Sequence, residues 1–350
     1  EITVEKCPSN ADNRQAKIST ILASGDKNID LISVNDEMIS EFKHKGYLEP
    51  LEKNVMTEEV RDSFPQKYLE SICEENGHIY SVPFQMDIMM FWVNQELLKQ
   101  AGLDEIKNTG DFDILQKSLK NPDQYAYGDA WENTHVYNSL SQFVNFWGGD
   151  YFDWTDPKTK DAARYMKSML DEKNTSPAQF VDQYEQMEEK FIRGKYGCVF
   201  MYTSALGTFL DADVYGKNKI HMAPLPVLHK KKATNIATWQ YVLNNASENK
   251  DAAVRFLQYA AGYEGSTEYA KIMKSYPARV DVIENEDIDL EGIDMIRKYL
   301  REYTLNARPL CENSMGAVSD MGKLFQGYVL GQCEEDSFFE QAQNCINTYY

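Results

Sequence analysis

The chain has 350 residues, of which 43% are hydrophobic and 12% aromatic, so it carries enough apolar surface to fold and too much for a disordered protein. Its length favours two lobes of ordinary size over one unusually large domain, and no apolar run approaches the ~18 residues of a membrane span. Lys and Arg number 36 against 55 Asp and Glu, and the resulting net charge of −19 would repel a phosphate backbone, which argues against nucleic acid as a partner.

The N-terminal region alternates strand, helix and strand. Residues 2–5 are β-like, and apolar residues then repeat at helical spacing until Gly25 and Asp26 end the helix. Residues 29–34 form a short apolar run that ends in the polar residues 35–37. We expect a βαβ unit whose second strand lies inside a parallel sheet, where ligands bind beyond the carboxyl ends of the strands.

The remaining chain continues the mixture of helices and strands. Short helices are expected in residues 37–75, where two prolines interrupt the pattern, and Gly102 is expected to cap a helix that starts at Gln95. Further strands are expected at residues 79–83, 89–93, 198–202 and 238–243, with helices from about 111 to 190 and after the last strand. No low-complexity linker is present, so short strands must connect the lobes.

The cysteines and histidines indicate neither a metal site nor a catalytic centre. The six cysteines are scattered without a Cys-x-x-Cys pair, and the five histidines do not cluster. Buried free thiols are expected, although an even count permits disulfides and Cys333 with Cys345 is the closest pair along the chain. No nucleophile elbow, zinc motif or phosphate-binding loop occurs, so no catalytic residue, metal or cofactor is predicted.

The order of several short segments resembles the family of extracellular solute-binding proteins of ABC importers, the maltose-binding-protein-like group that binds carbohydrates. The segments in the first third are Leu22-Ala23-Ser24-Gly25-Asp26, Gly46-Tyr47-Leu48-Glu49-Pro50-Leu51, Gly77-His78-Ile79-Tyr80-Ser81-Val82-Pro83 and Phe91-Trp92-Val93-Asn94-Gln95-Glu96-Leu97-Leu98. Those further along are Phe191-Ile192-Arg193-Gly194-Lys195-Tyr196-Gly197-Cys198-Val199-Phe200-Met201, Ala223-Pro224-Leu225-Pro226 and the strand from Trp239 to Leu243. The resemblance extends over about residues 1 to 345.

The resemblance implies an α/β, two-lobed periplasmic-binding-protein-like fold. Each lobe would be a mainly parallel sheet flanked by helices, with the ligand cleft between the lobes. The first lobe would comprise residues 1–90 and 238–292, and the second residues 91–237 and 293–350. Strands near residues 88–93, 234–240 and 288–300 would form the hinge. Family members also have a strand and a long helix before the segment that matches residues 2–5, and this sequence lacks both.

The resemblance also implies ligand-binding residues in the first lobe and at its border. Asp87 matches a position that holds a sugar hydroxyl in relatives, and a helix-capping role is the alternative. Asp36 and Glu37 follow the strand at 29–34, where Asp36 could also be an N-cap. Trp239 matches an aromatic residue on the hinge side of the pocket, with a core position as its alternative.

Three further ligand contacts are implied. Tyr202 follows the strand at 198–201 and has the same ambiguity as Trp239. Trp131 matches a region of the second lobe that stacks on sugar in relatives. Arg279 could fork onto vicinal hydroxyls or a sugar carboxylate, or pair with a carboxylate of the site.

The function implied is capture of a sugar or oligosaccharide by hinge closure and its delivery to a membrane permease. The protein would be a monomer without enzymatic activity, either in the periplasm or at the cell surface as a lipoprotein whose export signal and N-terminal Cys are not in this chain. Three alternatives remain open from the residues: a receptor for a polyamine or other cationic ligand, a secreted carbohydrate-active enzyme, and a receptor that signals rather than transports.

Overall fold

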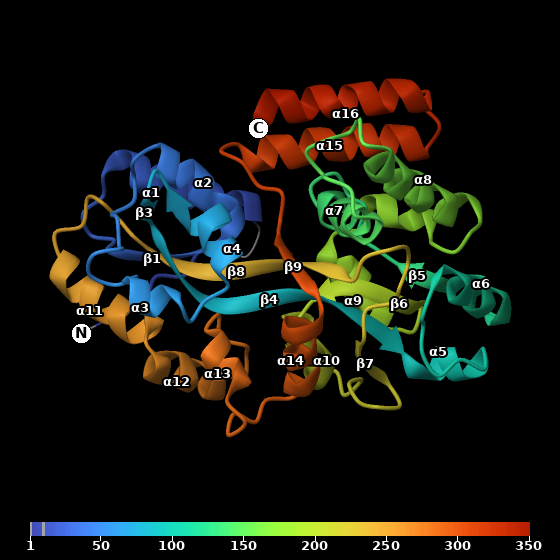
Figure 1. Ribbon diagram of the computed structural model, residues 1–350, viewed down its shortest axis with the longest axis horizontal. Helices are drawn as coiled ribbons and strands as arrows, with labels where there is room; N and C mark the ends of the chain where they lie inside the picture. The colour runs from blue at the N-terminus through green and yellow to red at the C-terminus, as the bar shows by residue number, and fades with distance from the viewer. Residues whose placement is uncertain (1, 9–10) are drawn as a thin grey trace. The chain divides into compact units, whose positions relative to one another are not determined.

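The chain folds into two compact units, each built from two separate stretches of sequence (Figure 1). The computed structural model describes residues 2–8 and 11–350. The first unit contains the chain up to Met86 together with Thr238–Leu290, and the second contains Asp87–Ala237 together with Glu291–Tyr350. The backbone therefore passes between the units three times, and two of these passages lie inside the long strands β4 (Ser81–Asn94) and β8 (Ala233–Leu243).

The first unit is a small sheet with helices around it. Its other elements are α1 (Ala11–Ser24), β1 (Leu31–Asn35), α2 (Asp36–His44), α3 (Glu58–Arg61), α4 (Gln66–Tyr68), the π-helical turn Leu69–Cys73, β2 (Glu74–Glu75), β3 (His78–Ile79), α11 (Lys250–Ala261), α12 (Tyr263–Met273) and α13 (Val280–Glu284). The predicted first helix is confirmed as α1, and Gly25 follows it with a φ of +64°, a backbone conformation that glycine adopts without strain.

Strand β1 pairs with the C-terminal half of β8. The pairing is antiparallel, with a register that runs from Leu31 opposite Leu243 to Asn35 opposite Trp239. Ile32 and Val34 are buried on one face of β1, while Ser33 between them is exposed on the other face. The predicted strand is thus confirmed, but its expected place in a parallel sheet is wrong.

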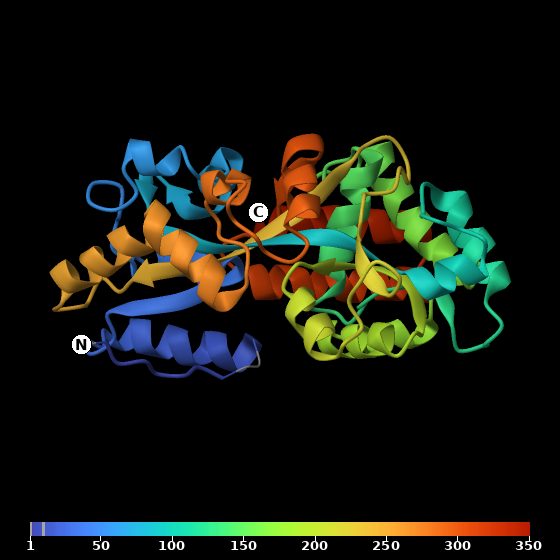
Figure 2. The ribbon, with the colours of Figure 1, turned by 90° about the horizontal axis from the view of Figure 1, so that it is seen from below.

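Residues 2–8 form no strand, contrary to the sequence-based prediction for residues 2–5. Ile2 is 72% exposed and Val4 86% exposed, so neither contributes apolar burial that would fix an extended segment against a sheet. The segment lies along α1 instead, where Glu5 accepts a hydrogen bond from Lys17 at 2.5 Å (Figure 2).

The second unit has a larger sheet and more helices. Its other elements are α5 (Gln95–Gln100), α6 (Thr109–Ser118), β5 (Tyr125–Gly128), α7 (Val136–Trp147), α8 (Pro157–Asp171), the 3-10 helix Pro177–Val181, α9 (Tyr184–Ile192), β6 (Tyr196–Tyr202), α10 (Ala205–Asp211), β7 (Ile220–Ala223), α14 (Ile293–Glu302), β9 (Thr304–Ala307), α15 (Ser314–Val329) and α16 (Glu335–Tyr349). Helices α15 and α16 form an antiparallel hairpin that packs partly on α7 (Figure 1).

The strands of this unit run in both directions. Strand β4 pairs antiparallel with β6 and with β7, whereas β5 is parallel to β6 and β9 is parallel to β8. All seven residues of β6 are buried, so this strand lies in the core. The α/β fold class is confirmed, but the mainly parallel sheets are wrong. A continuous apolar run indicates a strand covered on both faces, and here such strands also occur in antiparallel pairs.

Within residues 2–8 and 11–350, no helix has the length and hydropathy that would let it cross a bilayer.

Candidate functional site

Trp239 and Asn35 form the core of a candidate site in the first unit. They are directly opposite each other in the antiparallel pair of β1 and β8, so their side chains share one face of the sheet. Both are half-buried. The Nδ2 group of Asn35 donates to Glu37 Oε2 at 2.8 Å, while its buried Oδ1 has no hydrogen-bond partner within the described part of the chain. This face therefore combines an aromatic ring, a carboxylate and an amide oxygen with unused acceptor capacity.

Asp36 belongs to a buried network on the other side of the same strands. It is fully buried at the first position of α2, and its Oδ2 accepts a hydrogen bond from the Tyr68 hydroxyl at 3.0 Å. That hydroxyl accepts from Thr238 Oγ1 at 2.8 Å and from Gln240 Nε2 at 3.1 Å. Thr238 and Gln240 flank Trp239 on β8, and because successive side chains alternate, they point away from it. The network fixes the backbone from which Trp239 projects.

A cation lies against the indole of Trp239. The guanidinium carbon of Arg14, on α1, is 5.2 Å from the centre of the ring, which is within cation–π range. No sequence pattern singles out Arg14, because it is a half-buried residue of a helix that lies more than two hundred residues before its aromatic partner.

Asp87 begins the second unit and is buried, with 6% of its surface exposed. Its Oδ1 accepts from Thr203 Oγ1 at 2.7 Å and from the Ser204 backbone N–H at 2.9 Å. Burial raises the pKa of the Asp87 carboxyl above its ordinary value, against the opposing effects of these hydrogen bonds and of the Arg308 charge.

Tyr202 is part of an aromatic and cationic cluster in the second unit. Its hydroxyl donates to Asn138 Oδ1 at 2.9 Å, and its ring stacks on Tyr184 with a centroid separation of 5.9 Å. Arg308 is 7% exposed, lies 5.8 Å from the Tyr202 ring and donates to the Tyr137 hydroxyl at 2.6 Å. The cluster resembles the first unit's site in joining a planar ring to a guanidinium.

Trp131 is a core residue of the second unit. It is fully buried, and its Nε1 donates to Asp129 Oδ2 at 2.9 Å. Its ring packs edge-on against Phe180 and Phe325. Asp129 also accepts from Ser139, at 2.6 Å, and burial raises the pKa of its carboxyl. The ring and the Nε1–H group of Trp131 therefore both interact with other residues of the second unit.

Arg279 is also surrounded by protein groups. It is 8% exposed and donates to both carboxylate oxygens of Asp281, to the Ala261 carbonyl and to Ser63 Oγ, all within 3.0 Å. The carboxylate that Arg279 pairs with is Asp281, two residues along the chain in the same unit, and not one of the predicted site carboxylates.

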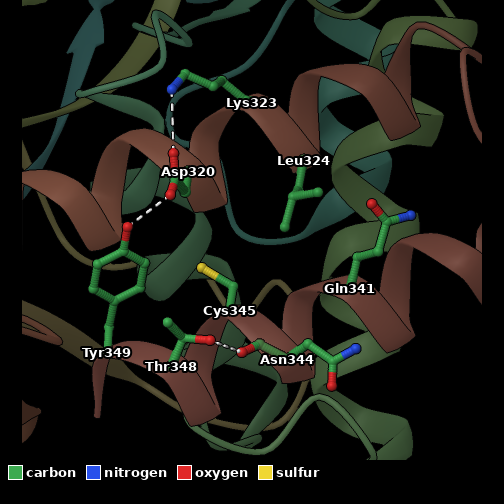
Figure 3. Close-up of a pocket in the computed structure, with 8 residues that line it drawn as sticks. All are labelled: Asp320, Lys323, Leu324, Gln341, Asn344, Cys345, Thr348 and Tyr349. Atoms are coloured by element: carbon green, nitrogen blue, oxygen red, sulfur yellow. Dashed lines mark hydrogen bonds and ion pairs between the residues drawn. The ribbon is translucent and has the colours of Figure 1, made fainter.

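A groove of about 460 Å³ lies between α15 and α16, away from all of these residues (Figure 3). Asp320 and Lys323 from α15 face Cys345 and Tyr349 from α16 across it. The Tyr349 hydroxyl donates to Asp320 at 2.7 Å. Within residues 2–8 and 11–350, no group of three or more His, Cys, Asp or Glu side chains could hold a metal ion.

The seven predicted contacts thus separate into distinct surroundings. In the first unit, Asp36, Glu37 and Trp239 lie at one end of β1, whereas Arg279 is at the start of α13. In the second unit, Asp87 and Tyr202 are close to Arg308, and Trp131 is in the core. Sequence reasoning missed Arg14, Tyr68, Tyr184 and Arg308. Asp129 was missed as well, because the strand that it follows, β5, has only four residues and gives no periodic signal.

The sequence has recognisable relatives. It is 24% identical over 239 residues to a probable amino-acid ABC transporter periplasmic-binding protein of Sinorhizobium fredii, covering 65% of this chain and 54% of the relative. It is 22% identical over 286 residues to the arabinooligosaccharide-binding protein of Bacillus subtilis, covering 77% of this chain and 65% of that protein. The chain therefore spans less than two thirds of the length of either relative.

A similar solved structure and a matching family model are consistent with these sequence relatives. The structure is similar to that of maltose-bound MalE3 of T. maritima, with a TM-score of 0.81, 17% identity and coverage of 97% of this chain and 90% of the other. The two proteins share the two-lobed fold. Residues 3–267 match the family model described as bacterial extracellular solute-binding protein. The chain belongs to the family of bacterial extracellular solute-binding proteins.

Proposed function

We propose that this protein is the substrate-binding protein of an ABC importer and that it captures a sugar or oligosaccharide by hinge closure. The observation that carries the proposal is the half-buried Trp239 ring beside the amide of Asn35 and the carboxylate of Glu37. Family membership supports it. The names of two similar proteins, which bind an arabinooligosaccharide and maltose, support the choice of ligand class.

Such a face matches the chemistry of a sugar ring. The apolar face of the sugar can cover an indole, while its hydroxyls need acceptors and donors at fixed positions. Glu37 supplies a charged acceptor, which forms hydrogen bonds roughly twice as strong as neutral ones. The unused acceptor on Asn35 Oδ1 is a second position for a ligand hydroxyl, since a buried acceptor without a partner costs free energy that a ligand would recover.

Glu37 and Trp239 are the ligand contacts proposed in the first unit, and Asp87 and Tyr202 are those proposed in the second. The other three residues predicted from the sequence have polar groups bound within the protein: Asp36, Trp131 and Arg279. Asp87 is the first residue of the second unit and Trp239 the second residue after the return to the first, so both lie in the chain next to a passage between the units. We propose that these passages bend when the ligand binds, because a ligand that binds the closed form better shifts the population toward it.

The proposed partner is a pair of membrane permease subunits, to which a monomer of this protein delivers its ligand. The family is one of extracellular proteins, and we propose a location in the periplasm or at the cell surface as a lipoprotein. The protein itself would catalyse no reaction.

A thermal-shift screen against mono- and oligosaccharides, sugar acids and polyamines, followed by calorimetry, tests the proposal, because a ligand that binds only the folded state raises the melting temperature. We expect a saccharide to raise it, and Trp239→Ala to abolish the shift. Tyr259→Ala is the matched control, since Tyr259 is an aromatic residue of the same unit that is 50% exposed on α11. A polyamine as the only ligand, or consumption of the saccharide during incubation, would overturn the proposal.

A further inference from the structure

Arg14 gives the Trp239 surface a fixed positive charge. Its guanidinium carbon is 5.2 Å from the centre of the indole ring, and α1 holds it there from a segment far away in the sequence. The guanidinium group of an arginine side chain carries a positive charge. Arg14 therefore already makes the cation–π interaction that this aromatic ring could offer to a ligand cation.

The charge of the whole chain makes this arrangement significant. With a net charge of −19, the protein attracts cations in general, and aromatic rings next to carboxylates are the surroundings that bind ammonium groups. Glu37, held by Asn35 next to Trp239, would strengthen that attraction. An arginine at the ring opposes it locally, because a second cation at the same ring would meet a like charge.

We infer that Arg14 is a specificity-determining residue that excludes cationic ligands from Trp239 and reserves the ring for an uncharged saccharide. The inference rests on the proposed function for its biological meaning, since it assumes that Trp239 contacts the ligand. Whichever saccharide binds, the surroundings of the Trp239 ring should be less accessible to cations than the net charge of the protein would predict.

Tryptophan fluorescence reports on this ring selectively. The chain has five tryptophans, all among the described residues, and Trp92, Trp131, Trp147 and Trp154 are buried with at most 7% of their surface exposed. Trp239 is half-buried and is the one that a dissolved quencher can reach most readily. Quenching by caesium ion, iodide and acrylamide then measures access for a cation, an anion and a neutral molecule. The Trp239→Phe variant gives the fluorescence and quenching that come from the other four tryptophans.

The experiment compares the wild type with Arg14→Gln, which removes the charge, and Arg14→Lys, which keeps it. At a constant ionic strength of about 0.1 M, a charge ~5 Å from the ring lies well within the Debye length of roughly 10 Å. We expect Arg14→Gln to raise the ratio of caesium to iodide quenching by on the order of three-fold or more, with acrylamide quenching changed much less. Arg14→Lys should keep the wild-type ratio.

A second measurement connects the charge to ligand choice. We expect spermidine to leave the melting temperature of the wild type unchanged and to raise that of Arg14→Gln. An unchanged quenching ratio in Arg14→Gln, with acrylamide quenching and melting temperature like the wild type, would overturn the inference and leave Arg14 as a packing residue. Equal ratios in Arg14→Gln and Arg14→Lys would do the same. If the ratio changes as expected but no saccharide binds, the proposed function fails and the inference about charge at Trp239 stands.

Discussion

The hydroxyl of Tyr68 donates a hydrogen bond to the buried carboxylate of Asp36 at 3.0 Å and accepts two others from Thr238 and Gln240. One side chain thereby joins α4, the start of α2 and strand β8. All four residues are buried, and the Tyr68 hydroxyl is the shared partner of the other three, so its removal takes one hydrogen bond from each of them.

Tyr68→Phe is therefore expected to destabilise the protein. It removes a donor to Asp36 and the acceptor of two buried donors, and we expect a loss of about 1–3 kcal/mol in the free energy of unfolding. Urea unfolding measures it. The control is Tyr259→Phe, because Tyr259 is 50% exposed on α11 and its replacement should change stability by less than about 0.5 kcal/mol. Equal effects of the two changes would contradict the structural role of the network.

Two glycines of α15 provide a test of how closely this helix packs. A Cβ on Gly322 would lie 1.9 Å from the carbonyl oxygen of Asn133, which is backbone and cannot move aside cheaply. A Cβ on Gly327 would meet nothing nearer than Gln332 Oε1 at 4.0 Å. We expect Gly322→Ala to lose about 1–3 kcal/mol or more and Gly327→Ala to gain up to ~1 kcal/mol, since alanine favours helix.

Thermal unfolding of the two variants measures this difference. Because both substitutions add the same methyl group to the same helix, their intrinsic helix propensities cancel, and the difference reports the contact with Asn133. Similar melting temperatures for Gly322→Ala and Gly327→Ala would mean that α15 does not approach the backbone of Asn133 this closely in solution.

Two carboxylates should affect stability with opposite dependence on pH. Burial raises the folded-state pKa of Asp87, so its protonated form favours the folded state at low pH, and this contribution is lost as pH rises from the ordinary value through the folded pKa. The Tyr349 hydrogen bond lowers the pKa of Asp320, so its contribution is present above the ordinary value and is lost as pH falls through the folded pKa.

Melting temperatures between about pH 3 and pH 7 test these signs in the variants Asp87→Asn and Asp320→Asn. Relative to Asp87→Asn, the wild type should lose stability as pH rises over this range. Relative to Asp320→Asn, it should gain stability, by a small amount because the Asp320 side chain is 48% exposed at the surface groove. If the difference in stability between the wild type and each variant changed with pH in the same direction for both variants, the Asp87 carboxyl would not be desolvated as described.

The thiols are expected to differ widely in reactivity. Burial raises the pKa of Cys73 to about 12, and it lies in the core beside Gln240. Cys333 is partly exposed between α15 and α16. A thiol reagent should therefore modify Cys333 in the native protein and Cys73 only after unfolding, as peptide mass mapping would reveal. Rapid native labelling of Cys73 would contradict the packing of this region.

The same mapping should find no bridge between Cys333 and Cys345. Cys345 is well along α16, and Cys333 precedes that helix. At 1.5 Å per helical residue the two lie on the order of 15 Å apart, far beyond the ~7 Å that a disulfide can join. All six cysteines have free thiols in the structure, which supports the sequence-based expectation of free thiols, although only Cys73, Cys198 and Cys345 are buried.

Local patterns predicted the elements with strong periodicity. The helix now seen as α1 and the helix after Gln95 were predicted within a few residues, and Gly102 ends the latter with a φ of +72°. Strand β4 was predicted as two strands because Pro83 and the polar residues after it interrupt the apolar pattern. Strands β5, β7 and β9 have four residues each, too few for a periodic signal.

The candidate site was predictable only where it follows a strand. Residues 35–37 were singled out because polar side chains come directly after the apolar residues of β1. Of the residues around them, Trp239 was proposed from a family position, whereas Tyr68 and Arg14 were not singled out, because they reach this part of the first unit through tertiary folding that local sequence does not encode. Asp87 was proposed from a family position, and the surroundings that raise its pKa depend on residues more than a hundred positions later.

The division of each unit into separate stretches of sequence has a consequence for the order of folding. Strand β1 pairs with residues of β8 that leave the ribosome about 200 residues later, which at 5–20 residues per second is roughly 10–40 s. Until then Ile32 and Val34 lack the strand against which they are buried. Long-range pairing of this kind folds slowly. The first unit can therefore be completed only after the residues up to Leu290 have been made, although it also contains the earliest residues of the chain, and β1 lacks its partner strand until β8 has been made.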